Sequence, residues 1–173
     1  MNSGIDQPMI GAGAFAAPRS IRFLTPALLL MVCLLFLQAR FRLVLVIGES
    51  MRPTLNHGNL LLVARNAYEH REPQRGDLVV AWCYSELIVK RVVGVPGEEV
   101  EIIEGTLFVN RQPVVEQYAV ARGSLNIDRG RLAGGRFALL GDNRGLPEGQ
   151  TVSAIVSKGD MLGKVICRIP VGR

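Results

Sequence analysis

ELIVKRVVGVPGEEVEIIEGTLFVN, residues 86–110, decides the fold class of this chain. The stretch holds three β-branched, apolar runs, at 86–94, 99–103 and 106–110. Pro96-Gly97 marks the first turn between them. Glu104-Gly105 predicts a tight hairpin, because glycine adopts a positive φ at little steric cost. Short β-branched runs bounded by such turns are typical of antiparallel strands.

Similar runs continue on both sides of this stretch, from Gly48 towards the C-terminus. They predict further strands at 60–64, 77–82, 136–141 and 164–169. No amphipathic helical pattern of about 11 residues occurs after Gly48. Residues 117–135 and 143–160 are rich in glycine and weakly patterned, which predicts long loops. A mainly β domain, a barrel or sandwich of antiparallel sheets, is therefore expected for residues 48–173.

An apolar block precedes this domain. It begins with FLTPALLLMVCLLFL at 23–37 and, after Arg40 and Arg42, ends with LVLVI at 43–47. As a helix, the first run is about 22 Å long, against a hydrocarbon core of about 30 Å. The two arginines can snorkel, which lets residues 41–47 lie along the membrane interface. We therefore expect a flexible tail at 1–22 and a membrane anchor at 23–47.

Two other interpretations of the apolar block are a cleaved signal peptide and a buried core helix. Cleavage after Ala39 puts Leu37 at the −3 position, where a small residue is needed, so an uncleaved anchor is favoured. Arginines flank the block on both sides, at 19 and 22 and at 40 and 42, so charge does not decide its orientation.

Charge and cysteine content exclude several classes of function. The chain carries 20 basic and 15 acidic residues, a net charge of +5, without a Lys/Arg run interleaved with aromatics, so no nucleic-acid partner is expected. Cys33, Cys83 and Cys167 show no C-x-x-C spacing, which argues against a zinc site or a disulfide framework. A bridge between Cys83 and Cys167 stays open. We expect no metal and no organic cofactor.

Lys90 is the first candidate for chemistry. In an extended strand it shares one face with Ile88 and Val92, while Arg91 lies on the other, so one of these adjacent cations points to the packed side. Burial lowers the pKa of a lysine, and a neutral lysine can act as a general base. A solvated face of the strand is the alternative interpretation.

Ser50 is the second candidate, in GESMRPTL at 48–55. The glycine and proline constrain the backbone around it and leave its hydroxyl exposed. A serine hydroxyl becomes a strong nucleophile when a nearby base takes its proton, and a neutral lysine can serve in a Ser-Lys dyad. An ordinary turn residue or helix cap is the alternative. The third feature is the turn Gly141-Asp142-Asn143-Arg144, either a wall of the site or a plain strand exit.

Four segments in this order resemble the type I signal peptidase family of membrane-bound Ser-Lys proteases. They are ESMRPTL at 49–55, RGDLVVAW at 75–82, KRVVGVPGEEV at 90–100 and ALLGDNR at 138–144. A weaker match follows at LGKV, 162–165. The resemblance covers residues 44–170, and four ordered segments are a far more specific signal than any one of them.

This resemblance implies a membrane-anchored serine endopeptidase that removes signal peptides from exported preproteins. Its nucleophile is Ser50, its general base is Lys90, and the oxyanion site is the Ser50 N–H, with Gly48 where some members carry a helping hydroxyl. Met51 belongs to the wall of the site. Substrate-binding or structural roles fall to Pro53, Arg91, Gly141, Asp142, Asn143, Arg144 and Gln150.

The resemblance also implies a location and a substrate class. The all-β domain is expected on the outer face of the bacterial cytoplasmic membrane, held by a single span in the lipid bilayer. The preproteins carry small residues at −3 and −1, which fit shallow pockets lined near residues 88–95 and 51–53.

One segment departs from the family. After GDNR the family carries Ser-x-Asp-Ser-Arg, whereas this chain reads Pro147-Glu148-Gly149-Gln150-Thr151. Gln150 stands at the second serine, where it can accept a hydrogen bond from Lys90. The change raises two alternatives: a specialised peptidase that matures pilin or secretion-system precursors, and a catalytically silent membrane β-module that binds exported chains. A self-cleaving Ser-Lys repressor is disfavoured by the apolar block and by the lack of a DNA-binding helical pattern.

Overall fold

The computed structural model describes residues 21–147 and 153–169. The chain divides into two compact units, Met1–Leu37 and Gln38–Arg173. The long helix α1, Ile21–Arg40, contains Pro26 and begins in the first unit. Among the described residues, no helix combines the length and the apolarity that a membrane span requires.

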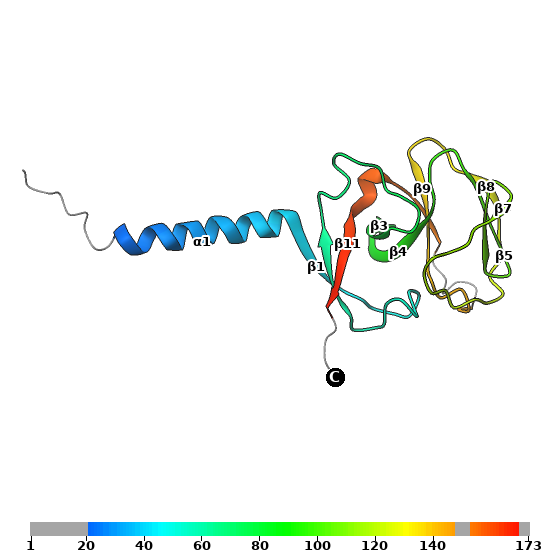
Figure 1. The fold of residues 1–173 in the computed structure, drawn as a ribbon, viewed down its shortest axis with the longest axis horizontal. Helices are drawn as coiled ribbons and strands as arrows, with labels where there is room; N and C mark the ends of the chain where they lie inside the picture. Colours follow the sequence, from blue (N-terminus) through cyan, green and yellow to red (C-terminus); the bar gives the residue numbers. More distant parts are fainter. Residues whose placement is uncertain (1–20, 148–152, 170–173) are drawn as a thin grey trace, which may run out of the picture. The chain divides into compact units, whose positions relative to one another are not determined.

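Two antiparallel sheets form the second unit (Figure 1). The larger sheet has the order β1-β2-β11-β3-β4-β9-β10. Its strands are β1 Phe41–Leu45, β2 Leu60–Ala64, β3 Leu78–Cys83, β4 Glu86–Gly94, β9 Arg136–Leu140, β10 Ala154–Ser157 and β11 Met161–Ile169. The smaller sheet has the order β7-β6-β5-β8. Its strands are β5 Glu99–Ile103, β6 Thr106–Val109, β7 Gln112–Pro113 and β8 Ile127–Arg131, and a 3-10 turn at Lys158–Asp160 precedes β11.

The sequence predicted the mainly β class and seven of these strands correctly, with boundaries within three residues. The hairpin between β5 and β6 also forms as predicted, with positive φ at Glu104 and Gly105. The two long loops were wrong in part, because β8 and β10 lie within them. β8 is mostly exposed, so it carries no apolar pattern, and the ladder to β5 holds it. β10 has only four residues, too few for its alternation to stand out.

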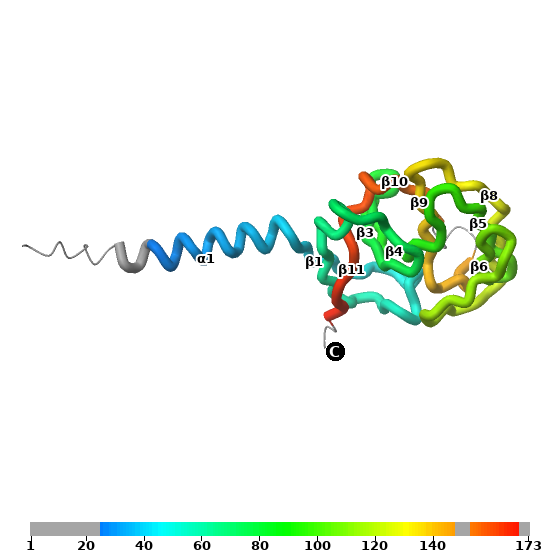
Figure 2. The backbone as a smooth tube through the Cα atoms, turned by 45° about the horizontal axis from the view of Figure 1, so that its top comes forward, coloured from blue at the N-terminus to red at the C-terminus, as the bar shows by residue number. Residues whose placement is uncertain are grey.

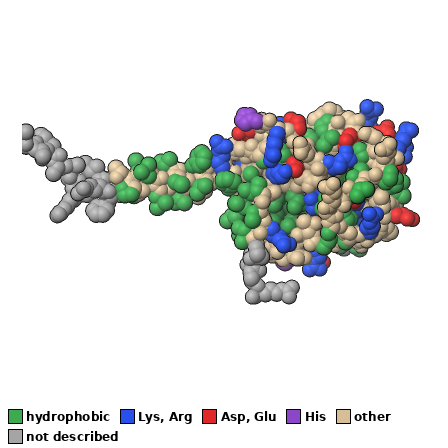
Figure 3. Space-filling model, in the orientation of Figure 1, with side chains coloured by type: hydrophobic (Ala, Val, Ile, Leu, Met, Phe, Trp, Pro, Cys, Tyr) green, Lys and Arg blue, Asp and Glu red, His purple; other side chains and the backbone are tan. Residues whose placement is uncertain are grey.

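β1 is a further difference from the sequence interpretation. Residues 41–47 were assigned to the anchor, yet Phe41–Leu45 pairs with β2 along its whole length. Phe41, Leu43 and Leu45 are exposed, so the pairing rests on backbone hydrogen bonds rather than on burial of these side chains. Figure 3 shows apolar side chains on the face of the domain where β1 and β11 lie.

β4 occupies the centre of the fold, between β3 and β9 (Figure 2). Its side chains enter three separate hydrophobic clusters: Val92 packs with Val79 and Phe137, Val93 with Ile102 and Leu107, and Val89 with Val80 and Met51. Because both faces of β4 are covered, Lys90 and Arg91 are both buried, at 3% and 6% exposure. The sequence expected this of only one of the two cations.

Candidate active site

Ser50 and Lys90 come together in the folded chain. Lys90 Nζ lies 2.6 Å from Ser50 Oγ, although forty residues separate the two in sequence. Lys90 projects from the middle of β4, and Ser50 lies in the turn between β1 and β2. A nucleophile and a base within hydrogen-bond distance form the basic geometry of covalent catalysis.

The turn that carries Ser50 is anchored by its neighbours. Met51 and Leu55 are each 2% exposed and pack in the hydrophobic cluster under β2. The N–H of Leu55 donates to the Met51 carbonyl at 2.9 Å. Gly48 has a φ of +97°, in the region that favours glycine, and its N–H donates to His57 Nδ1 at 3.2 Å. Met51 therefore anchors the turn in the hydrophobic core, and His57 supports Gly48.

The buried position of Lys90 favours its neutral form, which is the form that can act as a base. Burial lowers the pKa of Lys90 from its ordinary 10.5 to about 8, while the negative charge of Asp142 opposes this shift. A lysine with this pKa is partly neutral near pH 8, and the neutral form can accept the proton of Ser50.

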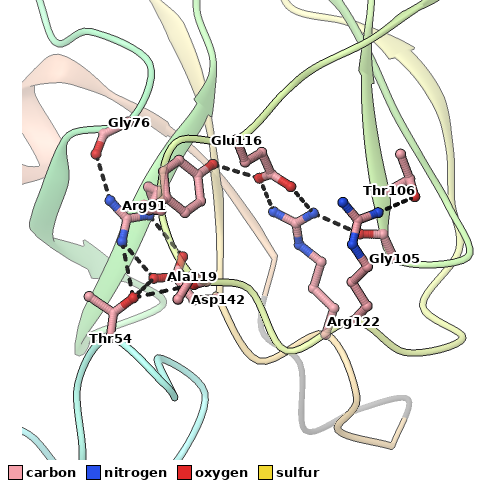
Figure 4. A network of polar contacts seen from close by, with 11 residues as sticks. Thr54, Gly76, Arg91, Gly105, Thr106, Glu116, Ala119, Arg122 and Asp142 are labelled. Carbon is pink, nitrogen blue, oxygen red and sulfur yellow. Dashed lines mark hydrogen bonds and ion pairs between the residues drawn. The ribbon is translucent and has the colours of Figure 1, made fainter.

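Arg91, the next residue on β4, lies in a different environment. Its Nε and Nη2 donate to the two carboxylate oxygens of Asp142 at 2.8 and 2.6 Å. Its Nη1 donates to the Gly76 carbonyl at 2.8 Å, and the Thr54 hydroxyl donates to Asp142 at 2.5 Å (Figure 4). A bidentate pair of this kind fixes both position and angle. The pair ties β4, the Ser50 turn and the turn after β9 together.

The turn after β9 lies directly against Ser50. The backbone N–H of Asn143 donates to the Ser50 carbonyl at 3.0 Å, and its side-chain amide donates to the Glu49 carbonyl at 3.2 Å. A Cβ added to Gly141 would lie 2.4 Å from the Ser50 carbonyl oxygen, so only glycine fits there. Gly141 and Asn143 thus set the position of the nucleophile's backbone.

Arg144 completes this turn by an ion pair that sequence reasoning missed. Its guanidinium binds Glu116, with Nη1 donating to Oε2 at 2.7 Å, and Nη1 also donates to the Gly105 carbonyl at 2.7 Å. The Tyr118 hydroxyl donates to Glu116 at 2.6 Å. Glu116 and Tyr118 gave no signal in sequence, because their partners come from other segments of the chain.

One predicted residue, Pro53, does not join this cluster. Pro53 is exposed and follows a cis peptide bond. Gln150 and most of the segment at 147–151 lie outside the described residues. In the described part of the chain, no group of three His, Cys, Asp or Glu side chains could hold a metal ion, and the three cysteines are free, so Cys83 and Cys167 do not pair.

Comparison with known proteins assigns the family. The model of the family described as signal peptidase, peptidase S26, matches residues 19–168. This chain belongs to that family. A probable signal peptidase I-1 of Synechocystis sp. is 28% identical over 86% of this chain and 80% of its own length. A signal peptidase I of Leptolyngbya laminosa is 30% identical over 73% of this chain and 68% of its own length.

One further relative and one solved structure also match this chain. Signal peptidase I T of Bacillus subtilis is 36% identical over 66% of this chain and 65% of its own length. A solved signal peptidase I of Enterococcus faecalis aligns with a TM-score of 0.40 at 22% identity, covering 56% of this chain and 98% of that one.

Proposed function

We propose that this chain removes signal peptides from exported preproteins, with Ser50 as the nucleophile and Lys90 as the general base. Membership of the signal peptidase family supports the reaction class. The observation that supports the assignment of roles is the 2.6 Å contact between Lys90 Nζ and Ser50 Oγ, made by a buried lysine whose pKa is lowered to about 8 by that burial.

The first half of the reaction forms an acyl-enzyme. Neutral Lys90 takes the hydroxyl proton of Ser50 as Oγ attacks the carbonyl carbon of the scissile bond. The oxyanion that forms accepts a hydrogen bond from the Ser50 N–H, which Asn143 keeps in place through the Ser50 carbonyl. Protonated Lys90 then gives its proton to the leaving amine, and the mature chain departs.

The second half hydrolyses the ester on Ser50. Lys90 is neutral again and takes a proton from a water molecule, which attacks the ester carbonyl. Collapse of this intermediate returns the proton to Ser50 Oγ and releases the signal peptide with a free carboxylate. No other proton carrier is needed, because one lysine serves in both halves.

The β4 strand also supports a site for an extended substrate. β3 pairs with β4 from Glu86 to Arg91, whereas β9 pairs with it only from Arg91 to Gly94. The first half of β4 therefore lacks a neighbour on the β9 side within the described strands, next to Lys90. A preprotein lying there as a strand would place its residues at −1 and −3 on the same face, and small side chains fit best against the partly buried Leu87 and Val89.

A membrane location belongs to the same proposal. Apolar side chains of α1 from Leu28 to Leu37 are about half exposed, and so are Leu43, Ile166 and other side chains on the β1–β11 face of the catalytic domain. We propose that residues 23–40 anchor the chain in the bacterial cytoplasmic membrane by a single span, with the domain on its outer face. The tail at 1–22 precedes this anchor.

The deciding experiment is cleavage of a preprotein with an Ala-x-Ala site by the full chain in detergent micelles. Wild type is expected to cleave, and Ser50→Ala and Lys90→Ala are expected to lose at least about 10³-fold in kcat/KM while folded. Cleavage retained by both variants overturns the dyad. A folded but inactive wild type directs the test to pilin-type precursors, where cleavage indicates a specialised peptidase and binding alone indicates a silent module.

A further inference from the structure

The side chain of Tyr118 stacks on Arg91, the residue that follows Lys90 on β4. The Cζ atom of Arg91 lies 3.8 Å from the centre of the Tyr118 ring, so the ring covers one face of the guanidinium that binds Asp142. By comparison, Arg71 lies 5.8 Å from the Tyr68 ring. Cation–π contacts gain most when the cation is desolvated. The ring therefore contacts Arg91 at an ion pair whose two side chains are 7% and 1% exposed.

Tyr118 is itself held by a second buried ion pair. Its hydroxyl donates to Glu116 at 2.6 Å, and Glu116 binds Arg144. The side chains of Arg144 and Glu116 are 1% and 5% exposed. Burial and the neighbouring Glu116 carboxylate raise the pKa of Tyr118 well above its ordinary value, which favours the protonated hydroxyl that donates to Glu116. The ring cannot turn away from Arg91 without breaking this bond.

The network around Tyr118 connects to the catalytic pair at two points, Arg91 and Asp142. Arg91 follows Lys90 on β4, and Asp142 precedes Asn143, whose N–H donates to the Ser50 carbonyl. The segment that carries Tyr118 also pairs with the same turn: the Ala121 N–H donates to the Asp142 carbonyl at 2.9 Å, and the Arg144 N–H donates to the Ala121 carbonyl at 2.8 Å. Tyr118 is therefore connected to Lys90 through strand β4 and to Ser50 through the turn after β9.

We propose that Tyr118 is a positioning residue for the Ser50–Lys90 pair, acting by covering the Arg91–Asp142 ion pair and keeping water from it. This inference rests on the proposed function, because it takes Lys90 as the general base.

The expected direction of its effect follows from the charges near Lys90. Asp142 raises the pKa of Lys90 and burial lowers it. Arg91 compensates the Asp142 charge for as long as the ring holds it in place. Loss of the ring admits water, which weakens the effect of burial, and loosens Arg91, which leaves Asp142 less compensated. Both changes raise the pKa of Lys90.

The test is the dependence of kcat/KM on pH, from about pH 6 to 10, for Tyr118→Leu in the full chain with the Ala-x-Ala preprotein. We expect the acid limb to move to higher pH by about half a unit or more, which is a loss of about threefold below the limb and recovery towards wild type above it. Tyr84→Leu is the matched control, because Tyr84 is 99% exposed, and its limb is expected to coincide with wild type. A Tyr118→Leu limb that coincides with wild type overturns the proposal.

Tyr118→Phe keeps the test decisive if the leucine variant does not fold. It retains the ring but loses the hydrogen bond to Glu116, and a smaller shift in the same direction is expected; an unshifted limb then overturns the proposal. Ser50→Ala and Lys90→Ala, measured alongside, separate the two ideas. If they still cleave, the proposed function fails; if they are inactive while the Tyr118 variants match wild type, only this inference fails.

Discussion

Lys90 and Arg91 are neighbours on one strand with opposite electrostatic surroundings. Both are nearly inaccessible to solvent. Among the described residues Lys90 forms no ion pair and its Nζ lies against a neutral hydroxyl, whereas Arg91 meets a carboxylate, a carbonyl and an aromatic ring. Burial therefore lowers the pKa of Lys90, while Arg91 keeps a compensated charge. Similar burial therefore favours a neutral base at Lys90 and a structural ion pair at Arg91.

The two residue types are not interchangeable in this arrangement. Arginine stays protonated at any accessible pH, so it cannot accept the Ser50 proton. Lysine presents a single ammonium group and cannot bind both oxygens of Asp142 in a planar, bidentate manner. The order Lys-Arg in the sequence thus assigns one chemical role to each face of β4.

Removing the counter-ion of Arg91 is expected to have the largest effect on stability. Asp142→Asn leaves a buried guanidinium uncompensated, which should lower the free energy of unfolding by about 3 kcal/mol or more. Urea unfolding followed by circular dichroism measures the change. Glu72→Gln is the control, because the Lys158–Glu72 pair is exposed and should contribute less than about 1 kcal/mol. Equal losses in the two variants would show that burial does not make the Arg91–Asp142 pair more important for stability than an exposed pair.

Removing the charge of Lys90 is expected to stabilise the protein, which is the opposite of the effect expected for Asp142→Asn. The pKa of Lys90 is about 8 in the folded chain and 10.5 ordinarily, so the unfolded state binds the proton more tightly. Wild type therefore loses stability as pH falls from 10.5 to 8. Lys90→Met should raise the free energy of unfolding by on the order of 2–3 kcal/mol at pH 7, and by less at pH 10.

Denaturant unfolding of Lys90→Met at these two pH values measures the gain. Lys158→Met, at a lysine that is partly exposed, is the matched control and should change little at either pH. A Lys90→Met variant that is less stable than wild type at pH 7 would show that the lysine is compensated after all.

The dependence of wild-type kcat/KM on pH also tests the electrostatic difference between Lys90 and Arg91. Because the neutral form of Lys90 is the base, kcat/KM should rise about tenfold per pH unit below pH 8 and level off above it. Initial rates in buffers of constant ionic strength measure the profile. A rate that is flat between pH 6 and 8 would assign the proton transfer to another group.

The sequence predicted those parts of the site that are encoded by a few neighbouring residues. The alternation around Lys90 indicated a buried cation, and the constrained turn at Ser50 indicated an exposed hydroxyl. It did not reach Thr54, Glu116 or Tyr118, because each acts through a partner on a distant segment. It also treated Met51 as part of the wall, whereas Met51 is 2% exposed and anchors the turn in the core.

The amino-acid sequence by itself determined the mainly β class, the hairpin at Glu104-Gly105 and the adjacency of a lysine and an arginine on one strand. These follow from side-chain period and turn chemistry, which act over a few residues. The burial of both cations, the contact of Lys90 with Ser50 and the contacts of Arg91 with Asp142 and Tyr118 arise from the packing of distant segments. Those outcomes depend on which strands cover β4, and burial by distant strands sets the charge of each group.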